Sequence, residues 1–248
     1  MASFPNQNNS TRKVTTTTKT TFTDQKSTCD PRSFTSVGLD VSSSMHGAPI
    51  EEAIGSVDNL ANMMCKTNKN AHMEVSVFGG AHAPGGMVVM PRRPGFAINF
   101  DILKNNIMEN FGGNTPMYDA VNATLDKIKS DYDQGKLTSS MRKNVIIIND
   151  GKDNASLPGS LQALNLRLTH PGVPNLNVYF LAVAGADVTS MNYLAAGKKH
   201  VHVIDERGAD VSTIKRTLCC ILVVLLCLSY IDRSVSNYPS PQPTPMNE

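Results

Sequence analysis

The segment NVIIINDG (residues 144–151) is the stretch from which the fold class is predicted. It joins a continuous run of mostly β-branched residues to an Asp-Gly pair. An apolar run without polar alternation is typical of a central strand that is covered on both faces, as strands of parallel sheets are. The segment therefore predicts a sheet with helices on both sides.

The chain on either side of this segment alternates between strand patterns and helix patterns. Apolar or alternating runs predict further strands at 34–39, 72–79, 95–100, 177–185 and 200–204. Apolar residues at helical spacing predict helices at 49–64, 101–111, 117–132, 160–168 and from about residue 209. The Gly- and Pro-rich segment 79–95 is predicted to be a loop. Strands that alternate with helices indicate βαβ units, so we expect an α/β fold with a doubly wound, mostly parallel central sheet flanked by helices.

The two ends of the chain differ in composition from its middle. Residues 1–33 form a polar, Thr-rich N-terminal tail, for which disorder is favoured over an added edge strand. Residues 232–248 form a Pro-rich tail that is predicted to be disordered. One domain is therefore expected over residues 34–231, a length that a single hydrophobic core can serve.

The end of this domain, TLCCILVVLLCLSYI (217–231), allows two interpretations. It continues an amphipathic helix, so it is a candidate for the closing helix of the domain. It is also a possible membrane anchor, although a membrane span normally takes about 20 apolar residues. The closing helix is the favoured interpretation, and an association with a membrane through this segment stays open.

The composition of the chain limits the kinds of binding partner and the cellular compartment that can be expected for the protein. The formal net charge of +2 and the lack of aromatic residues among the short basic clusters argue against nucleic-acid binding. The five cysteines show no metal-ligand spacing, and the first residues show no hydrophobic stretch of a secretory signal. A cytoplasmic, reducing setting is expected. The oligomeric state cannot be read from these features.

Oxygen side chains follow three predicted strand ends or helix starts. Asp40, Ser42 and Ser44 form a D-x-S-x-S pattern directly after the first strand. Thr115 precedes the helix at 117–132, where it is also a good N-cap, and Asp150 ends the NVIIIN strand. Ligands of parallel α/β sheets bind at the carboxyl ends of the strands. We therefore expect these five residues to meet at one edge of the sheet.

Two carboxylates and three hydroxyls make a set of hard oxygen ligands. Such ligands suit Mg²⁺, or Mn²⁺, better than zinc or copper. Because the hydroxyls are neutral, much of the charge of the cation stays uncompensated. An Asp or Glu of a protein partner could then complete the ligand set.

The order GLDVSSSM, GGNTPMYDAV, IIINDG resembles a von Willebrand factor type A domain with its metal-ion-dependent adhesion site (MIDAS). The resemblance covers about residues 34–216 and implies Asp40, Ser42, Ser44, Thr115 and Asp150 as the metal site. Ser43 and Asn149 depart from residues frequent in the family, but neither is a ligand position. The resemblance is greater to stand-alone intracellular A domains, including the tellurite-resistance type, than to secreted adhesion proteins. It implies a non-enzymatic module that binds proteins through a divalent metal.

Two other functions are possible alternatives. A tail-anchored membrane scaffold would use 217–231 as its anchor. A metal-dependent hydrolase or phosphotransferase would use Asp40 as its nucleophile, but such an enzyme needs a general acid or base two residues on, where this chain has Ser42. His200 and His202 have the spacing of metal ligands, but they are interpreted as strand residues because no third soft ligand is near.

Overall fold

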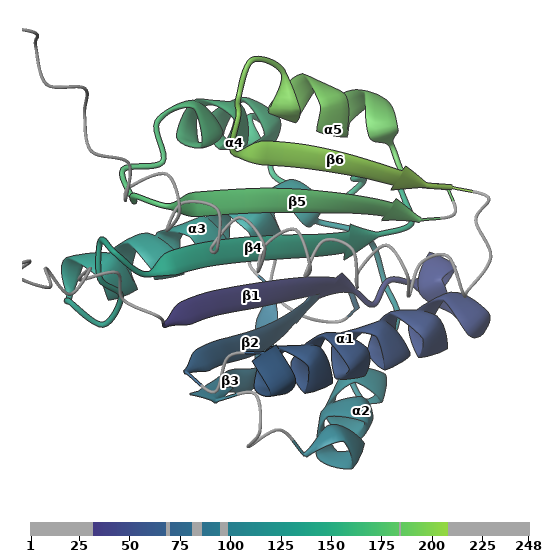
Figure 1. Cartoon of the computed structure of the whole chain (residues 1–248). Coiled ribbons are helices and arrows are strands. Elements are labelled where there is room, and N and C mark those ends of the chain that lie inside the picture. Colours follow the sequence, from purple (N-terminus) through teal and green to yellow (C-terminus); the bar gives the residue numbers. More distant parts are fainter. Residues whose placement is uncertain (1–31, 68–69, 81–85, 95–98, 184, 208–248) are drawn as a thin grey trace, which may run out of the picture.

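A six-stranded sheet with the order β3-β2-β1-β4-β5-β6 forms the centre of the molecule (Figure 1). The computed structural model describes residues 32–67, 70–80, 86–94, 99–183 and 185–207. All neighbouring strands are parallel except β2 and β3, which are antiparallel. The strands are β1 (Ser33–Asp40), β2 (Ala71–Phe78), β3 (Met87–Pro94), β4 (Arg142–Asn149), β5 (Leu176–Val183) and β6 (Val201–Glu206). The doubly wound, mostly parallel fold predicted from the sequence is confirmed.

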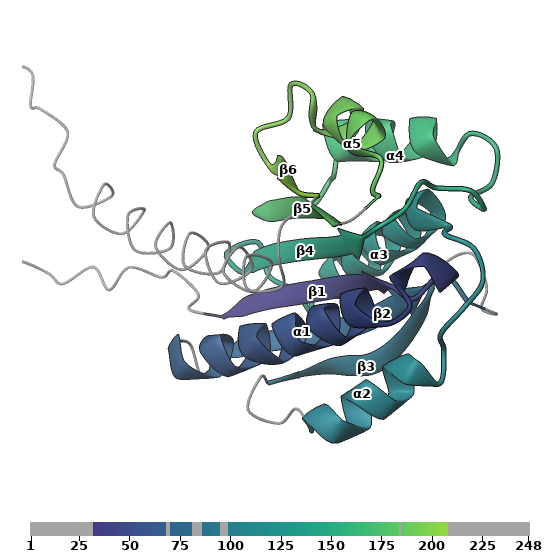
Figure 2. The same cartoon turned by 90° about the vertical axis from the view of Figure 1, so that its right-hand side faces the viewer.

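Helices cover both faces of this sheet (Figures 1 and 2). The described helices are η1 (Ser43–Met45), α1 (Ala48–Thr67), α2 (Phe100–Met108), α3 (Met117–Asp133), α4 (Ser160–Thr169) and α5 (Val188–Ala195). The apolar stripes of α1 and α2 pack against one face of the sheet, and those of α3, α4 and α5 pack against the other. Strand β4 contributes to both cores, since Ile146 and Ile148 face α1 while Val145 and Ile147 face α3. This two-sided burial explains the continuous apolar run of β4.

The sequence prediction was wrong around the antiparallel edge strand. Residues 87–94, predicted as loop, form β3, and Pro91 within it is tolerated because β3 is an edge strand. The strand predicted at 95–100 is contradicted at its end, where the side chain of Asn99 accepts a hydrogen bond from Ile102 N and caps α2. The short helix α5 was not predicted.

Several predictions fall on residues that the structure does not describe. These are the Thr-rich tail, apart from its last two residues, residues 81–85 of the predicted loop, residues 95–98 of the predicted strand, the helix expected from about residue 209, the segment 217–231 and the tail 232–248. Residue Ser33, assigned to the tail, is already the first residue of β1. Within the described ranges, no helix combines the length and apolar character needed to cross a membrane.

Candidate metal centre

The five predicted ligand residues lie at the carboxyl edge of the parallel strands. Asp40 is the last residue of β1, and Ser42 and Ser44 follow it in the turn that leads to α1. Asp150 comes directly after β4, the strand that neighbours β1 in the sheet. Thr115 lies in the loop between α2 and α3. Residues that are up to 110 positions apart in the sequence therefore gather at one edge, as the position of ligand sites in such sheets predicts.

A continuous chain of hydrogen bonds links four of these residues. The backbone N–H of Ser42 donates to Asp40 Oδ1 at 2.8 Å, and the hydroxyls of Ser42 and Ser44 are 3.0 Å apart. Ser44 Oγ in turn donates to Asp150 Oδ1 at 2.8 Å. Thr115 lies beside this chain, since a Cβ built on Gly151 would be 3.6 Å from Thr115 Oγ1 and equally far from Ser44 Oγ. The structure thus brings all five predicted residues into one cluster.

The two carboxylates of the cluster are buried at an energetic cost. Asp40 is fully buried, and this burial raises its pKa to about 7, with the negative charges of Asp150 and Asp153 adding to the effect and hydrogen bonds from Ser42 opposing it. Burial also raises the pKa of Asp150, against the hydrogen bond that Ser44 donates. A cation between the two side chains would favour their ionised forms.

One oxygen of Asp40 has no protein partner. Asp40 Oδ2 is buried and has no hydrogen-bond donor among the residues that the structure describes. Buried polar atoms nearly always have a partner, so an unpaired one marks a place where a water or an ion can bind. Ser42 is also buried, whereas Ser44 is exposed, so the cluster opens to solvent on the side of Ser44. An unpaired carboxylate oxygen next to clustered hydroxyls fits a hard divalent cation.

The described part of the chain contains no second candidate metal site built from His, Cys or clustered acidic residues. No group of three or more His, Cys, Asp or Glu residues converges there. His200 and His202, which have metal-like spacing in the sequence, make other contacts: His200 Nε2 lies 2.9 Å from Leu168 O, and His202 stacks on Tyr179. His202 lies within β6, as predicted, but β6 begins at Val201, so the prediction that His200 is also a strand residue was wrong by one position.

Glycine-rich loops hold the hydroxyls in place. Gly112 N donates to Val41 O at 2.7 Å, and Ser43 N donates to Gly113 O at 3.2 Å, so the α2–α3 loop is bonded to the serine turn. Gly80, two residues after the end of β2, forms a bridge with Gly113 and so joins this segment to the same loops. Gly113 has a φ of +74°, and a Cβ there would lie 2.4 Å from Gly80 O. The backbones approach so closely that only glycine fits at this position.

The loop after Asp150 is attached to the start of α3. Asp153 Oδ2 accepts hydrogen bonds from Tyr118 N at 2.8 Å and from Ser156 Oγ at 2.6 Å. Thr115 N donates to Asn154 Oδ1 at 2.8 Å, and Asn154 N donates to Thr115 O at 3.1 Å. The first residue of α3 is Met117, and Pro116 precedes it with no side-chain cap. The prediction that Thr115 caps this helix is therefore wrong, because Asp153 takes that role from a different loop.

The supporting roles of Asp153 and Asn154 were not predicted from the sequence. The loop Lys152-Asp153-Asn154 could be read equally as a partner contact or as a solvated loop. The signal that was available is the pairing of Asp153 with Ser156 three residues on, a spacing at which Asp and Ser commonly bond to local backbone groups. The contact to Tyr118 joins residues 35 positions apart, and local sequence patterns do not reveal it.

Replacing Asp153 by alanine is expected to lower the affinity for the metal, although Asp153 is not one of the five proposed ligands. The variant loses the cap of α3, which costs about 1 kcal/mol of stability, and it frees the loop that positions Asp150 and Thr115. Removal of a supporting partner typically lowers metal affinity about 10- to 100-fold. Isothermal titration with Mg²⁺ measures this effect, and Lys152→Ala, a change at the exposed neighbouring residue, serves as the control. Equal affinities for the two variants would contradict the supporting role of Asp153.

The sheet order and the helices on both faces define the class of the protein: an α/β domain with the von Willebrand factor type A fold. Three solved structures show this likeness. The von Willebrand factor type A protein from Catenulispora acidiphila has a TM-score of 0.58 and 16% identity, over 77% of this chain and 42% of its own. Proximal thread matrix protein 1 from the mussel byssus, with a zinc-occupied MIDAS motif, has a TM-score of 0.53 and 12% identity, over 80% of this chain and 46% of its own. The SpRpn10 VWA domain has a TM-score of 0.52 and 11% identity, over 71% of this chain and 88% of its own.

The chain therefore spans less than half the length of the first two structures and most of the third. No protein-family model and no curated protein matches the sequence. The likeness concerns the fold, because the identities are between 11% and 16%.

Proposed function

We infer that this chain is a protein-binding module that requires a divalent metal and receives an acidic side chain from its partner. The observation that carries this inference is the buried Asp40, whose Oδ2 atom has no donor among the described residues. Hydrogen bonds link Asp40 through Ser42 and Ser44 to Asp150, and Thr115 lies near Ser44 at the same sheet edge. We propose these five residues as the holders of Mg²⁺ or Mn²⁺.

The composition of the cluster explains the need for an acidic partner. Two carboxylates and three neutral hydroxyls leave a divalent cation short of oxygen ligands, of which Mg²⁺ takes six. The bound cation would supply a point of attachment for a carboxylate from outside. The exposed Ser44 lies on the open side of the cluster, where a partner can approach. The zinc-occupied MIDAS motif of the mussel protein, which shares this fold, supports a divalent metal at this place.

Catalysis is not part of the proposed function. A hydrolase that used Asp40 as its nucleophile would need a general acid or base at the position of Ser42. The cytoplasmic location and the stand-alone intracellular type remain predictions. The role of 217–231, with the closing helix favoured over a membrane anchor, also remains a prediction, since this segment lies outside the described residues.

A chelation experiment tests the proposed function. Full-length chain is immobilised and loaded with a cell extract in Mg²⁺, and bound proteins are eluted with EDTA. We expect a defined set of proteins to elute from the wild type, to be missing from an Asp40→Ala column, and to rebind the wild type when purified with Mg²⁺ restored. Binding that persists in EDTA, or that is equal on the variant column, would contradict the inference.

A further inference from the structure

Asn149 is a buried side chain that stands directly before Asp150. It is the last residue of β4 and is fully buried. Val145 and Ile147 of the same strand face α3, so the alternation of side chains along a strand places Asn149 on that face as well. Asp150, the next residue, accepts a hydrogen bond from Ser44 at the metal centre. Asn149 therefore lies next to a proposed metal ligand without belonging to the ligand set.

Both polar atoms of the Asn149 side chain bond to the backbone of Gly151. Asn149 Nδ2 donates to Gly151 O at 2.8 Å, and Gly151 N donates to Asn149 Oδ1 at 3.4 Å. Asparagine side chains commonly bond to the backbone two residues on and so close a tight turn. The residue at the centre of this turn is Asp150. The Asn149 side chain thus fixes the backbone on both sides of the Asp150 carboxylate.

Among side chains of this size, only the carboxamide can make both bonds. It carries an acceptor oxygen and a donor nitrogen, which match the N–H and the C=O of Gly151. An aspartate at position 149 could accept from Gly151 N but could not donate to Gly151 O, and a leucine of similar size could do neither. The residue type at position 149 is therefore essential for the turn.

Gly151, which Asn149 holds, adjoins two hydroxyls of the site and a further loop. A Cβ built on Gly151 would be 3.6 Å from Ser44 Oγ and 3.6 Å from Thr115 Oγ1. Gly151 O also accepts a hydrogen bond at 3.3 Å from the N–H of Asp187, the residue that caps α5. The bonds from Asn149 to Gly151 therefore also set how close the turn lies to both hydroxyls.

The Asp150 carboxylate is consequently held from two sides. Its Oδ1 atom accepts the hydrogen bond from Ser44 Oγ at 2.8 Å, and its backbone is held by the two bonds of Asn149. Mg²⁺ needs near-octahedral ligands at about 2.0–2.1 Å, whereas Ca²⁺ accepts about six to eight oxygens at about 2.3–2.6 Å in flexible arrangements. A carboxylate with a fixed position favours the smaller and more demanding cation.

We propose that Asn149 is a positioning residue that makes the metal centre selective for Mg²⁺ over Ca²⁺. This proposal rests on the proposed function, since it requires a divalent cation at the five ligand residues. Asn149 does not bind the cation itself and acts through the turn that carries Asp150. Without its two bonds the carboxylate can move and adapt to the longer ligand distances of Ca²⁺. The affinity for Mg²⁺ should then fall more than the affinity for Ca²⁺.

Calorimetric titrations of the metal-free, full-length chain with Mg²⁺ and with Ca²⁺ test this proposal. The deciding quantity is the ratio of the two affinities, because a loss of stability or a change of charge alters both affinities together. Asn149→Leu should lower the preference for Mg²⁺ about tenfold or more, since the partners that orient a metal ligand typically contribute about 10- to 100-fold in affinity.

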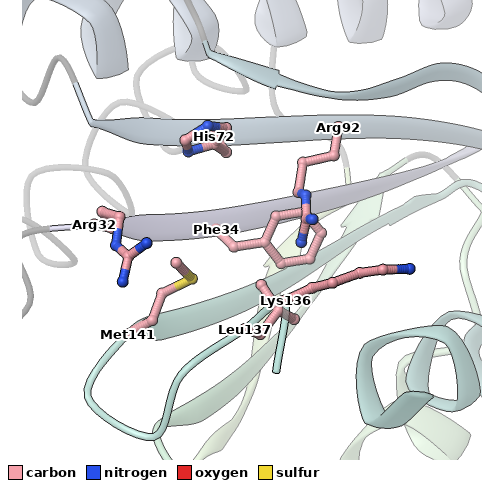
Figure 3. A pocket seen from close by; sticks show the side chains of 7 residues that line it. All are labelled: Arg32, Phe34, His72, Arg92, Lys136, Leu137 and Met141. Atoms are coloured by element: carbon pink, nitrogen blue, oxygen red, sulfur yellow. The ribbon is translucent and has the colours of Figure 1, made fainter. Parts of the chain in front are cut away.

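Asn144→Leu is the matched control for this experiment. Asn144 is also a buried asparagine of β4, but it lies near the start of the strand, about 16 Å from Asn149 at the usual rise. Met141, just before this start, lines a recess at the edge of the sheet opposite the metal centre (Figure 3). The control removes the same carboxamide from the same strand and should keep the wild-type ratio within about twofold.

Asn149→Asp keeps the test decisive if Asn149→Leu folds poorly. It loses only the donor to Gly151 O, and its added charge strengthens the binding of both cations, so the ratio should still fall. A wild-type ratio in the folded Asn149 variant would overturn the proposal, as would an equal fall of the ratio in Asn144→Leu. These two results leave the metal centre in place, whereas a wild type that binds neither cation would overturn the proposed function and the role of Asn149 with it.

Discussion

Replacement of Asp40 by alanine is expected to abolish Mg²⁺ binding while the domain stays folded. Asp40 supplies the one buried oxygen of the cluster that lacks a partner among the described residues. Loss of groups that only support a metal ligand costs about 10- to 100-fold in affinity, so loss of a ligand should cost about 100-fold or more. Titration calorimetry with Mg²⁺ and with Mn²⁺ measures the change.

Stability measured in EDTA separates this effect from unfolding. The variant loses the hydrogen bond from Ser42 N, worth about 1 kcal/mol, but it also removes a buried carboxylate with an unpaired oxygen, which is unfavourable in the absence of a cation. We therefore expect thermal unfolding of the metal-free variant within about 3 °C of the wild type.

Ser43 provides the control for this experiment. It stands between Ser42 and Ser44 but is exposed, and the described hydrogen bonds use its backbone and not its side chain. Ser43→Ala should keep the affinity for Mg²⁺ within about twofold of the wild type. An Asp40→Ala variant that binds Mg²⁺ as well as Ser43→Ala does would remove Asp40 from the metal site.

Local sequence patterns were sufficient to predict most strands of the sheet, but they did not predict the antiparallel edge strand β3. The buried run of β4 and the helical spacing in α1 and α3 follow from burial alone, so they are visible in the sequence. The strand β3 mixes apolar residues with Pro91 and two arginines, since an edge strand is neither fully buried nor regularly alternating. Its pairing with β2 contains register shifts, and these further weaken the alternation that would reveal it.

In the candidate site, too, some features follow from local sequence patterns and others from contacts between distant parts of the chain. Each proposed ligand follows a recognisable strand or precedes a recognisable helix, so the topology rule for parallel sheets was enough to bring the five together. The groups that hold the five proposed ligands in place could not be recognised in the sequence. The contacts of Asp153 with Tyr118 and of Gly113 with Gly80 join loops from distant parts of the chain, and only the folded backbone defines them.

Replacement of Gly113 by alanine should therefore damage both stability and metal binding. The φ of +74° disfavours any side chain by about 1–2 kcal/mol. The added Cβ would also lie 2.4 Å from Gly80 O and 2.9 Å from Gly80 Cα, which are backbone atoms that cannot rotate away. Overpacking of this kind costs about 1–3 kcal/mol more. Chemical denaturation should show a total loss of about 2–5 kcal/mol, and the separation of the two loops should weaken Mg²⁺ binding because Thr115 lies two residues away.

Gly135 is a matched control, because it separates the cost of backbone conformation from the cost of the collision. Its φ of +72° is nearly the same, but a Cβ there would meet nothing within 4 Å. Gly135→Ala should lose only the conformational part, about 1–2 kcal/mol, and should bind Mg²⁺ like the wild type. If the two variants lost the same stability and kept the same affinity, the close contact between the loops would not be needed for the site. A larger loss in Gly113→Ala alone, accompanied by weaker Mg²⁺ binding, would show that the joined loops position the hydroxyls that the sequence places beside Asp40.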